Sequence, residues 1–299
     1  MIPVLFVVTI LVFSIIRFIP GEPARLILGE KATPEAIAAL TEKLGLTEPL
    51  ISQYFLFLRQ IFTLDFGNSF TYQMPVAKLL ASRFPVTLAL TLMSTALSLL
   101  ISLPLGYFAG VHKDKLGDQA VRTASLVAIS MPSFWVGLLL MIVFALKLRW
   151  FPAGGWADTL GGQFRCLILP AITQSLMTTA LLLRNTRNCV VDITRMDYVD
   201  FARSKGIPDS EVRSRHVMRN AMVSTVTLLS MRMAATLGGS VIIETVFSIP
   251  GMGKLASDAI FGRDYAVVQF VVLMFAVLVL VINLITDILY SFLDPRVSL

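Results

Sequence analysis

Charged side chains are scarce in this chain. Asp, Glu, Lys and Arg make up only 15% of its 299 residues, whereas 56% are hydrophobic, and the mean hydropathy is +0.78. A soluble domain of this length could not bury so much apolar surface in one core. The apolar residues occur in runs close to the roughly 20 residues that a helix needs to cross about 30 Å of hydrocarbon, and the ten-residue alternation of barrel strands is absent. The sequence therefore predicts an all-α polytopic membrane protein.

Cysteine and histidine are also rare, with two of each. Cys166 and Cys189 fall near opposite ends of the predicted fourth span, so they cannot approach to disulfide distance. Neither belongs to a CxxC pair, and His112 and His216 lie in different loops, which argues against a metal site built from Cys and His. The net charge of +6 is concentrated in a few loops and forms no basic face. We expect no metal or cofactor bound by this chain and no nucleic-acid partner.

The apolar runs predict about six transmembrane helices. Their ranges are 1–18, 84–111, 119–148, 167–183, 221–247 and 266–293. The chain then divides into a first transmembrane helix (1–19), an extracytoplasmic segment (20–83) and a core of helices 2 to 6 (84–299) that contains a long loop at 184–220.

Lys and Arg next to span ends resist translocation and so indicate the cytoplasmic side. The loops 112–118 and 184–220 hold ten of them in 44 positions, whereas 147–166 and 248–265 hold five in 38. This bias predicts that the loop 184–220 and both termini face the cytoplasm. A cleaved signal peptide over residues 1–24 is the alternative, but a charged start and a small-x-small cleavage site are not evident. We expect instead that a short basic segment is missing from the start.

One polar stretch interrupts the apolar sequence: "DYVDFARSKGIPDSEVRSRHVMRN", residues 197–220. On a helix its first residues form a stripe at i, i+3, i+4 and i+7, made by Tyr198, Phe201, Ala202 and Lys205. Gly206 is placed to end that helix with positive φ, and the next helix begins at 209 or 210. The stripe needs a cover, which could be the chain's own helix ends, lipid headgroups or a separate soluble protein.

This stretch resembles the cytoplasmic signature of the membrane permease subunits of ATP-binding cassette (ABC) importers, in their dipeptide, oligopeptide and nickel branch. That signature is a Glu-Ala-Ala type helix, then a Gly, then a second helix. Here its positions are Asp200, Ala202 and Gly206, followed by His216, Arg219 and Asn220 in "RHVMRNA". The departures are Asp for Glu, and Phe201 for the first Ala. Further matching stretches cover almost the whole chain in the same order: "FIPGEPA", "LGLTEPLISQY", "LDFGNSF", "RFPVTLALT", "SMPSFW", "GGSVIIETVFSIPGMG", "RDYAVVQ" and "NLITDILYSFLDPR".

The resemblance implies a type I ABC importer permease of a bacterial inner membrane. Such a subunit pairs with a second, homologous permease, two cytoplasmic ATPases dock on the loop, and an extracytoplasmic binding protein delivers the substrate. The residues that it assigns to ATPase docking are Tyr198, Asp200, Phe201, Ala202, Lys205, Gly206, His216 and Arg219.

Short peptides are the expected substrate. Nickel, a metal chelate or glutathione is the alternative within the branch, and a secondary transporter or channel is the alternative outside it. A secondary transporter would favour internal repeats, and the two halves of the chain show no convincing duplication.

The chain is not expected to be an enzyme, because it has no phosphate loop of its own. "PGMGKL" has Ser248 where such a loop needs Gly, and Leu255 follows Lys254. ATP and Mg²⁺ would be used by the partner ATPases.

Three charged residues fall within predicted spans, where each costs on the order of 2.5 to 3.5 kcal/mol on insertion scales and so faces a cavity or a partner. Arg232 and Glu244 lie in the fifth span, about 18 Å apart along a helix, and Asp287 lies in the sixth. All three are candidates for the translocation path. The alternatives are structural bonding for the two carboxylates and, for Arg232, an ion pair with the partner permease.

Overall fold

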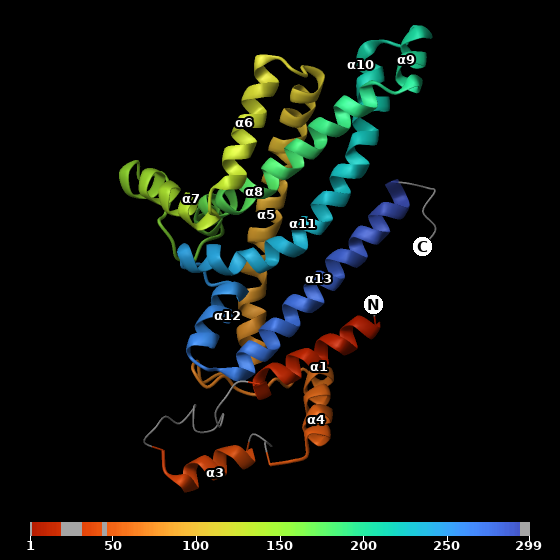
Figure 1. The fold of residues 1–299 in the computed structure, drawn as a ribbon. Helices are drawn as coiled ribbons and strands as arrows, with labels where there is room; N and C mark the ends of the chain where they lie inside the picture. The colour runs from red at the N-terminus through yellow and green to blue at the C-terminus, as the bar shows by residue number, and fades with distance from the viewer. Residues whose placement is uncertain (1, 19–31, 44–46, 294–299) are drawn as a thin grey trace. The chain divides into compact units, whose positions relative to one another are not determined.

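The computed structural model describes residues 2–18, 32–43 and 47–293. Within these ranges all regular elements are helices, as predicted, and the one strand-like feature is an isolated bridge between Asn68 and Pro75 (Figure 1). The chain forms two compact units, Met1–Thr87 with Pro250–Leu280, and Leu88–Ile249 with Val281–Leu299.

The first unit is built around an aromatic cluster. The ring of Phe13 lies 5.2 Å from that of Tyr54, and the ring of Phe57 lies 5.7 Å from that of Phe270. The Tyr54 hydroxyl also forms a 2.8 Å hydrogen bond with Oγ1 of Thr9. The helices of this unit are α1 (Ile2–Phe18), α3 (Pro34–Lys43), α4 (Leu50–Thr63), the start of α5 (Val76–Val111), α12 (Met252–Phe261) and α13 (Tyr265–Leu293) up to residue 280.

A buried carboxylate ties the loop before α5 to the start of α13. Asp264 is 2% exposed, and its Oδ2 accepts hydrogen bonds from Oγ of Ser69 at 2.6 Å and from the amide of Thr71 at 3.0 Å. Its Oδ1 accepts from the amide of Val267 in the first turn of α13 at 3.4 Å, as a capping residue does. Two stretches far apart in the sequence, "LDFGNSF" and "RDYAVVQ", therefore meet here.

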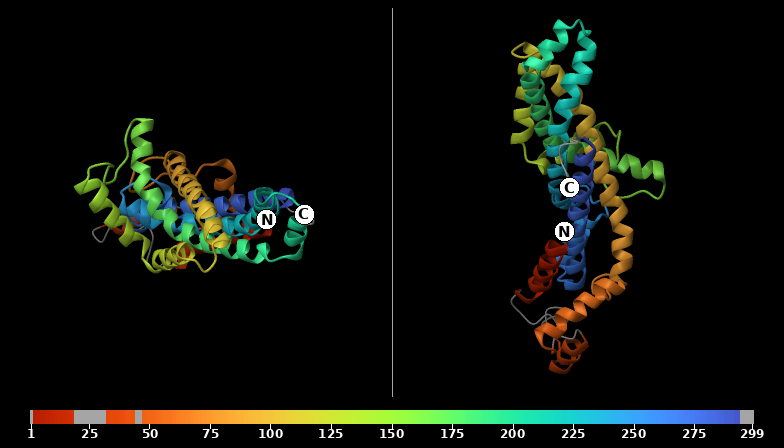
Figure 2. Two further views of the ribbon diagram at one scale, coloured as in Figure 1. Left: turned by 90° about the horizontal axis from the view of Figure 1, so that it is seen from above. Right: turned by 90° about the vertical axis from the view of Figure 1, so that its right-hand side faces the viewer.

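The second unit contains the rest of α5 and the helices between it and residue 249. These are α6 (Leu116–Ser130), α7 (Ser133–Leu140), the π-helix η1 (Met141–Lys147), α8 (Leu160–Thr194), α9 (Asp197–Ser204), α10 (Asp209–Glu211), the π-helix η2 (Val212–Met218) and α11 (Arg219–Val246). Figures 1 and 2 show α9 and α10 at the place where α8 and α11 converge. The predicted polar stretch thus forms two short helices and a π-helical turn that leads directly into α11.

A row of small residues lets α5 approach α8 closely. The row has one small residue every fourth position: Ser94, Ser98, Ser102, Gly106 and Gly110. The Oγ of Ser98 donates to the carbonyl of Ser175 at 3.2 Å. A Cβ at Gly106 would lie 2.8 Å from Cβ of Thr186, and one at Gly110 would lie 2.6 Å from Cγ1 of Val190. We call this contact the α5–α8 seam.

Within the described residues, four or five of the six predicted spans correspond to helices long and apolar enough to cross a membrane. Among the described residues, four helices are long and apolar enough: α5, α8, the continuous helix Asp209–Val246, and Tyr265–Thr286 of α13. A fifth results if α6 and α7–η1 count as one span. Of α1, the part Pro3–Ser14 counts as a shorter apolar helix among the described residues.

The span predicted over 119–148 is broken at Pro132. α6 and the α7–η1 helix are bent by 102° relative to each other. Proline lacks an amide hydrogen and disfavours the α conformation of the residue before it. Met131, which precedes Pro132, accordingly has extended angles of φ −88° and ψ 131°.

The absence of a Cys166–Cys189 disulfide is confirmed, since both thiols are free. α8 extends well beyond the predicted span 167–183, and the two cysteines lie on this one helix. At 1.5 Å per residue they are about 35 Å apart along its axis.

Candidate functional site

The candidate site is α9 together with the elements on which it packs. Its inner face is made by Val199, which is fully buried, and Ala202, which is 6% exposed. These side chains join an apolar cluster with residues of α8, η2 and α11: Val190, Ile193, Val212, Val217 and Ala221. The chain's own helix ends therefore cover one side of α9, and Ala202 is on that side.

The outer face of α9 carries two aromatic side chains. Tyr198 is 40% exposed and Phe201 is 60% exposed. The ammonium group of Lys205 lies 4.6 Å from the centre of the Phe201 ring, in a cation–π arrangement. The four-residue stripe predicted from the sequence is thus divided, with Ala202 turned inward and the other three exposed. Val199, which that stripe did not include, contributes most to the inner face.

Gly206 ends α9 with φ +79°, which confirms the predicted helix stop. Its amide donates to the carbonyl of Arg203 at 2.9 Å, and the amide of Ile207 donates to the carbonyl of Ala202 at 3.3 Å. These two bonds are the pair that defines a Schellman motif, and the apolar contact between Ile207 and the α9 cluster accompanies it. A built Cβ on Gly206 meets nothing within 4 Å, so the backbone angle alone requires glycine here.

Four exposed charges join α9 to α10. The guanidinium of Arg203 bridges Oδ1 of Asp209 at 3.2 Å and Oδ1 of Asp200 at 3.3 Å, and that of Arg213 contacts Oδ2 of Asp209 at 2.6 Å. Asp209 precedes the apolar part of the helix that continues into α11. Desolvation alone would raise the pKa of its carboxyl group. The charges of Arg213 and Arg203 outweigh it, and the pKa of Asp209 lies below its ordinary value. Exposed pairs of this kind contribute little to stability, because solvent screens them.

A second polar contact joins α9 to the start of α11. Nδ2 of Asn220 donates to the Tyr198 hydroxyl at 2.9 Å and to the carbonyl of His216 at 2.8 Å. The Tyr198 hydroxyl also donates to that carbonyl, at 3.4 Å. Of the predicted site residues after Gly206, His216 therefore takes part through its backbone. Arg219 is exposed beside this contact. Asn220 is part of the motif "RHVMRNA" but is not among the predicted site residues.

A buried ion pair near the same end of α8 was not found from the sequence. The guanidinium of Arg187 in α8 donates to Asp118 in α6, at 2.6 Å to Oδ2 and 3.0 Å to Oδ1. The Asp118 side chain is 0% exposed and that of Arg187 is 12% exposed. Oδ2 of Asp118 also accepts the amide of Asp114 at 2.9 Å. This bidentate pair fixes the first turn of α6 against α8.

The two intramembrane candidates whose side chains are described, Arg232 and Glu244, are not brought together. Arg232 is half-buried in α11, and its guanidinium has no hydrogen bond or ion pair with any described residue. Glu244 lies three turns later on the same helix and is fully buried. Further along α11, Gly238 and Gly239 face open space, since a Cβ built on either glycine has no atom within 4 Å. The side chain of Asp287 lies outside the described residues.

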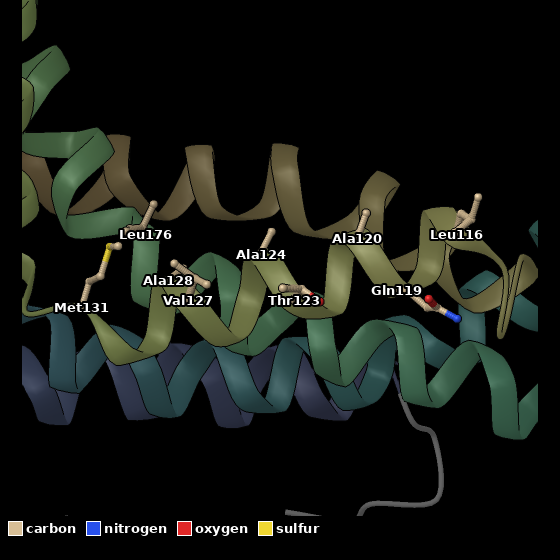
Figure 3. Close-up of a pocket in the computed structure, with 9 residues that line it drawn as sticks. All are labelled: Leu116, Gln119, Ala120, Thr123, Ala124, Val127, Ala128, Met131 and Leu176. Carbon is tan, nitrogen blue, oxygen red and sulfur yellow. The ribbon is translucent and has the colours of Figure 1, made fainter.

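A shallow groove of about 740 Å³ runs along α6 (Figure 3). Its lining is mostly small and apolar, and comprises Leu116, Gln119, Ala120, Thr123, Ala124, Val127, Ala128, Met131 and Leu176. No charged side chain lines it, so it offers no partner for the terminal charges of a peptide.

Comparison with protein families gives two matches that together cover most of the chain. The family described as "Binding-protein-dependent transport system inner membrane component" matches residues 102–299. Its N-terminal companion, "Binding-prot-dependent transport system membrane comp, N-term", matches residues 1–91.

Several known proteins are similar over nearly their whole length. A Brucella suis protein with the provisional name of peptide transport system permease protein is 39% identical over 299 residues, which is 99% of this chain and 95% of that protein. The glutathione transport system permease protein of Salmonella choleraesuis is 37% identical over 297 residues, again 99% and 95%.

Two solved structures share the fold. The MetNI methionine ABC transporter in inward-facing conformations matches with a TM-score of 0.59 at 16% identity, covering 72% of this chain and 96% of that one. An amino acid ABC transporter matches with a TM-score of 0.55 at 15% identity, covering 72% and 94%.

Proposed function

The chain belongs to the family of binding-protein-dependent transport system inner membrane components, and from this premise we propose that it is one of two permease subunits of an ABC importer for short peptides. As a permease it is a transmembrane, non-catalytic component of a bacterial inner membrane. Family membership sets aside the alternative of a secondary transporter or channel. The proposal adds the partners, namely a second homologous permease, two cytoplasmic ATPases and an extracytoplasmic binding protein.

The observation that carries the proposal is that α9 has one face buried on the chain itself and an exposed aromatic face opposite. Its inner face is held by Val199 and Ala202 in an apolar cluster of the chain itself, while Phe201 on the outer face is 60% exposed. An ATPase that closes on nucleotide can move a permease only through an element that packs against the ATPase on one side and against the permease on the other. Covering the rest of one aromatic side chain supplies about 1 to 2 kcal/mol, a part of the 1.5 to 3 kcal/mol for complete burial.

The orientation follows from this role. α9 docks an ATPase only if the loop 184–220 lies in the cytoplasm, which is the side that its eight Lys and Arg residues favour. Both termini then face the cytoplasm as well.

Short peptides are proposed as cargo because the similar proteins bear the names of peptide and glutathione systems. Glutathione is itself a modified tripeptide with free carboxylates. Arg232 fits such a cargo, since a guanidinium binds a carboxylate through two parallel hydrogen bonds, and no described residue occupies it. We place Arg232 in the translocation path and keep Glu244 and Asp287 as further candidates there.

The assembly is tested by purifying the tagged chain from its host in mild detergent and identifying its partners and their bound molecules by mass spectrometry. We expect two ATPase subunits, a second permease and a binding protein that carries a short peptide. A nickel ion or chelate on the binding protein would replace the peptide assignment with the metal alternative. Recovery of this chain alone, with uptake persisting after ATP depletion, would refute the importer.

The role of Arg232 is tested with peptides that differ only at the C-terminus. We expect Arg232→Gln to slow uptake of a tripeptide with a free carboxylate more than uptake of its C-terminal amide, and Arg232→Lys to retain part of the difference. Equal uptake of both peptides by wild type and Arg232→Gln would remove Arg232 from the path. Loss of the second permease from the purified complex would instead indicate an ion pair between the subunits.

A further inference from the structure

The contact between Tyr198, Asn220 and the His216 carbonyl has a different character from the rest of the α9 packing. The apolar cluster under α9 holds it by burial, which is non-directional. Hydrogen bonds weaken steeply when distance or angle changes. The 2.9 Å bond from Nδ2 of Asn220 to the Tyr198 hydroxyl and the 2.8 Å bond to the His216 carbonyl therefore define one position of α9 relative to α11.

The exposed ion pairs cannot serve the same purpose. Arg203 and Asp209 join α9 to α10, which has only three residues, and Arg213 extends that network by one turn within the same helix. None of these pairs reaches a residue of α11. Among the polar contacts of the described residues, the three-group contact links α9 to the first turn of α11.

The place of the contact along the chain is also informative. It lies where the π-helical turn η2 (Val212–Met218) gives way to α11, and π-helical turns inside α-helices occur frequently at functional sites. Asn220 is hydrogen-bonded both to a carbonyl of that turn and to the Tyr198 hydroxyl of α9. α11 then continues without interruption to Arg232 and to the open backbone at Gly238 and Gly239.

We infer that Tyr198 and Asn220 are positioning residues that pass a movement of α9 to α11, and that Phe201 is the aromatic residue that seats the partner ATPase. The inference rests on the proposed function, because a docked ATPase is what moves α9. The Tyr198 hydroxyl is engaged by the chain's own α11 and η2. The ring of Phe201 makes no such contact with α11 or η2, and it faces outward with Lys205 beside it.

The test follows the response of α11 to nucleotide and needs no knowledge of the cargo. Ala235, on the exposed side of α11, is changed to Cys in a chain whose own two cysteines are Ala. The whole complex is reconstituted into lipid vesicles. The rate of alkylation by a water-soluble maleimide is then compared between the nucleotide-free state and the state trapped with ATP and vanadate.

We expect the alkylation rate to depend on nucleotide in the otherwise unchanged chain. Tyr198→Phe, which removes one hydroxyl, and Asn220→Ala should each reduce that dependence about two- to tenfold, the equivalent of one net hydrogen bond. The double variant should show no further loss, because both changes break one contact. The matched control is Ser204→Ala, which also removes a hydroxyl from α9, but one that bonds only to the Phe201 carbonyl of the same helix. The control should respond like the parent.

Each outcome bears on one of the two claims. A full nucleotide response in Tyr198→Phe, or additive losses in the double variant, would overturn the inference. So would a loss of bound ATPase or a lowered melting temperature in Tyr198→Phe, because the hydroxyl would then serve only folding or docking. No response of α11 in a parent complex that retains its ATPases would also overturn it. If the parent binds no ATPase, the proposed function fails first and this inference fails with it.

Discussion

The buried pair between Asp118 and Arg187 gives the sharpest stability prediction. Asp118→Asn keeps the size of the side chain and an acceptor for the Asp114 amide, but it removes the charge that compensates Arg187. Breaking a buried pair from one side costs about 3 to 5 kcal/mol. Because the Arg187 side chain is 12% exposed and regains some solvent, we expect about 3 kcal/mol, toward the lower limit of that range.

The assay is a heating series on the purified chain in detergent, with the fraction of monodisperse protein measured by size-exclusion chromatography. A loss of about 3 kcal/mol corresponds to a decrease in apparent melting temperature of roughly 6 to 12 °C for a unit of 150 to 250 residues. Arg187→Gln should cause a similar loss, and the double variant should lose less than the sum of the two, because neither charge is then left alone. Additive losses, or single losses below about 0.5 kcal/mol, would show that the pair does not hold α6 to α8.

Three further changes test the seam and the loop. Gly110→Val should cost about 1 to 3 kcal/mol by overpacking, since its Cβ would lie 2.6 Å from Val190. Adding Val190→Ala should recover part of the lost melting temperature, and no recovery would contradict the close approach. Gly206→Val should abolish uptake with membrane insertion intact, whereas Gly206→Asn should retain more uptake because Asn tolerates positive φ. Equal uptake by wild type and Gly206→Val would refute the need for this backbone angle. Phe201→Ala should reduce the ATPase recovered with the purified chain, and full recovery would exclude Phe201 as the docking residue.

Features set by local backbone chemistry could be predicted from the sequence. Glycine at the end of a short polar helix predicted the left-handed stop at Gly206, and the structure supplies both Schellman bonds there. Long apolar runs predicted helices, and the described chain contains no regular element of another kind. Pro132 is the sequence signal for the break between α6 and α7, since proline disfavours the α conformation of the residue before it.

Features set by contacts between distant residues could not be predicted in this way. Asp118 and Arg187 are 69 positions apart, and nothing in either local sequence selects the other. The inward-facing residue of α9 could not be predicted for a related reason, because a stripe of period 3.6 does not say which of two adjacent apolar faces packs inward. Val199 and Tyr198 are neighbours, and the tertiary cluster decided between them. The row from Ser94 to Gly110 is visible in the sequence as small residues at every fourth position, but the row does not say which helix it faces.

The change in solvent along α8 explains why one helix uses two kinds of contact. Lipid tails are as apolar as the side chains they touch, so helices in a bilayer gain little from apolar burial and associate instead by close approach and polar contacts. The α5–α8 seam has that composition, with serine and glycine at every fourth position of α5. Toward its end α8 passes Arg187 and enters the cluster around Val190 and Ile193, where apolar burial holds α9. Burial of that kind is effective only against water. If α9 lies in the cytoplasm as proposed, its apolar packing weakens on cooling, together with the hydrophobic effect. The α5–α8 seam does not weaken in this way. Transport that fails on cooling while α5 and α8 remain packed would follow from this difference.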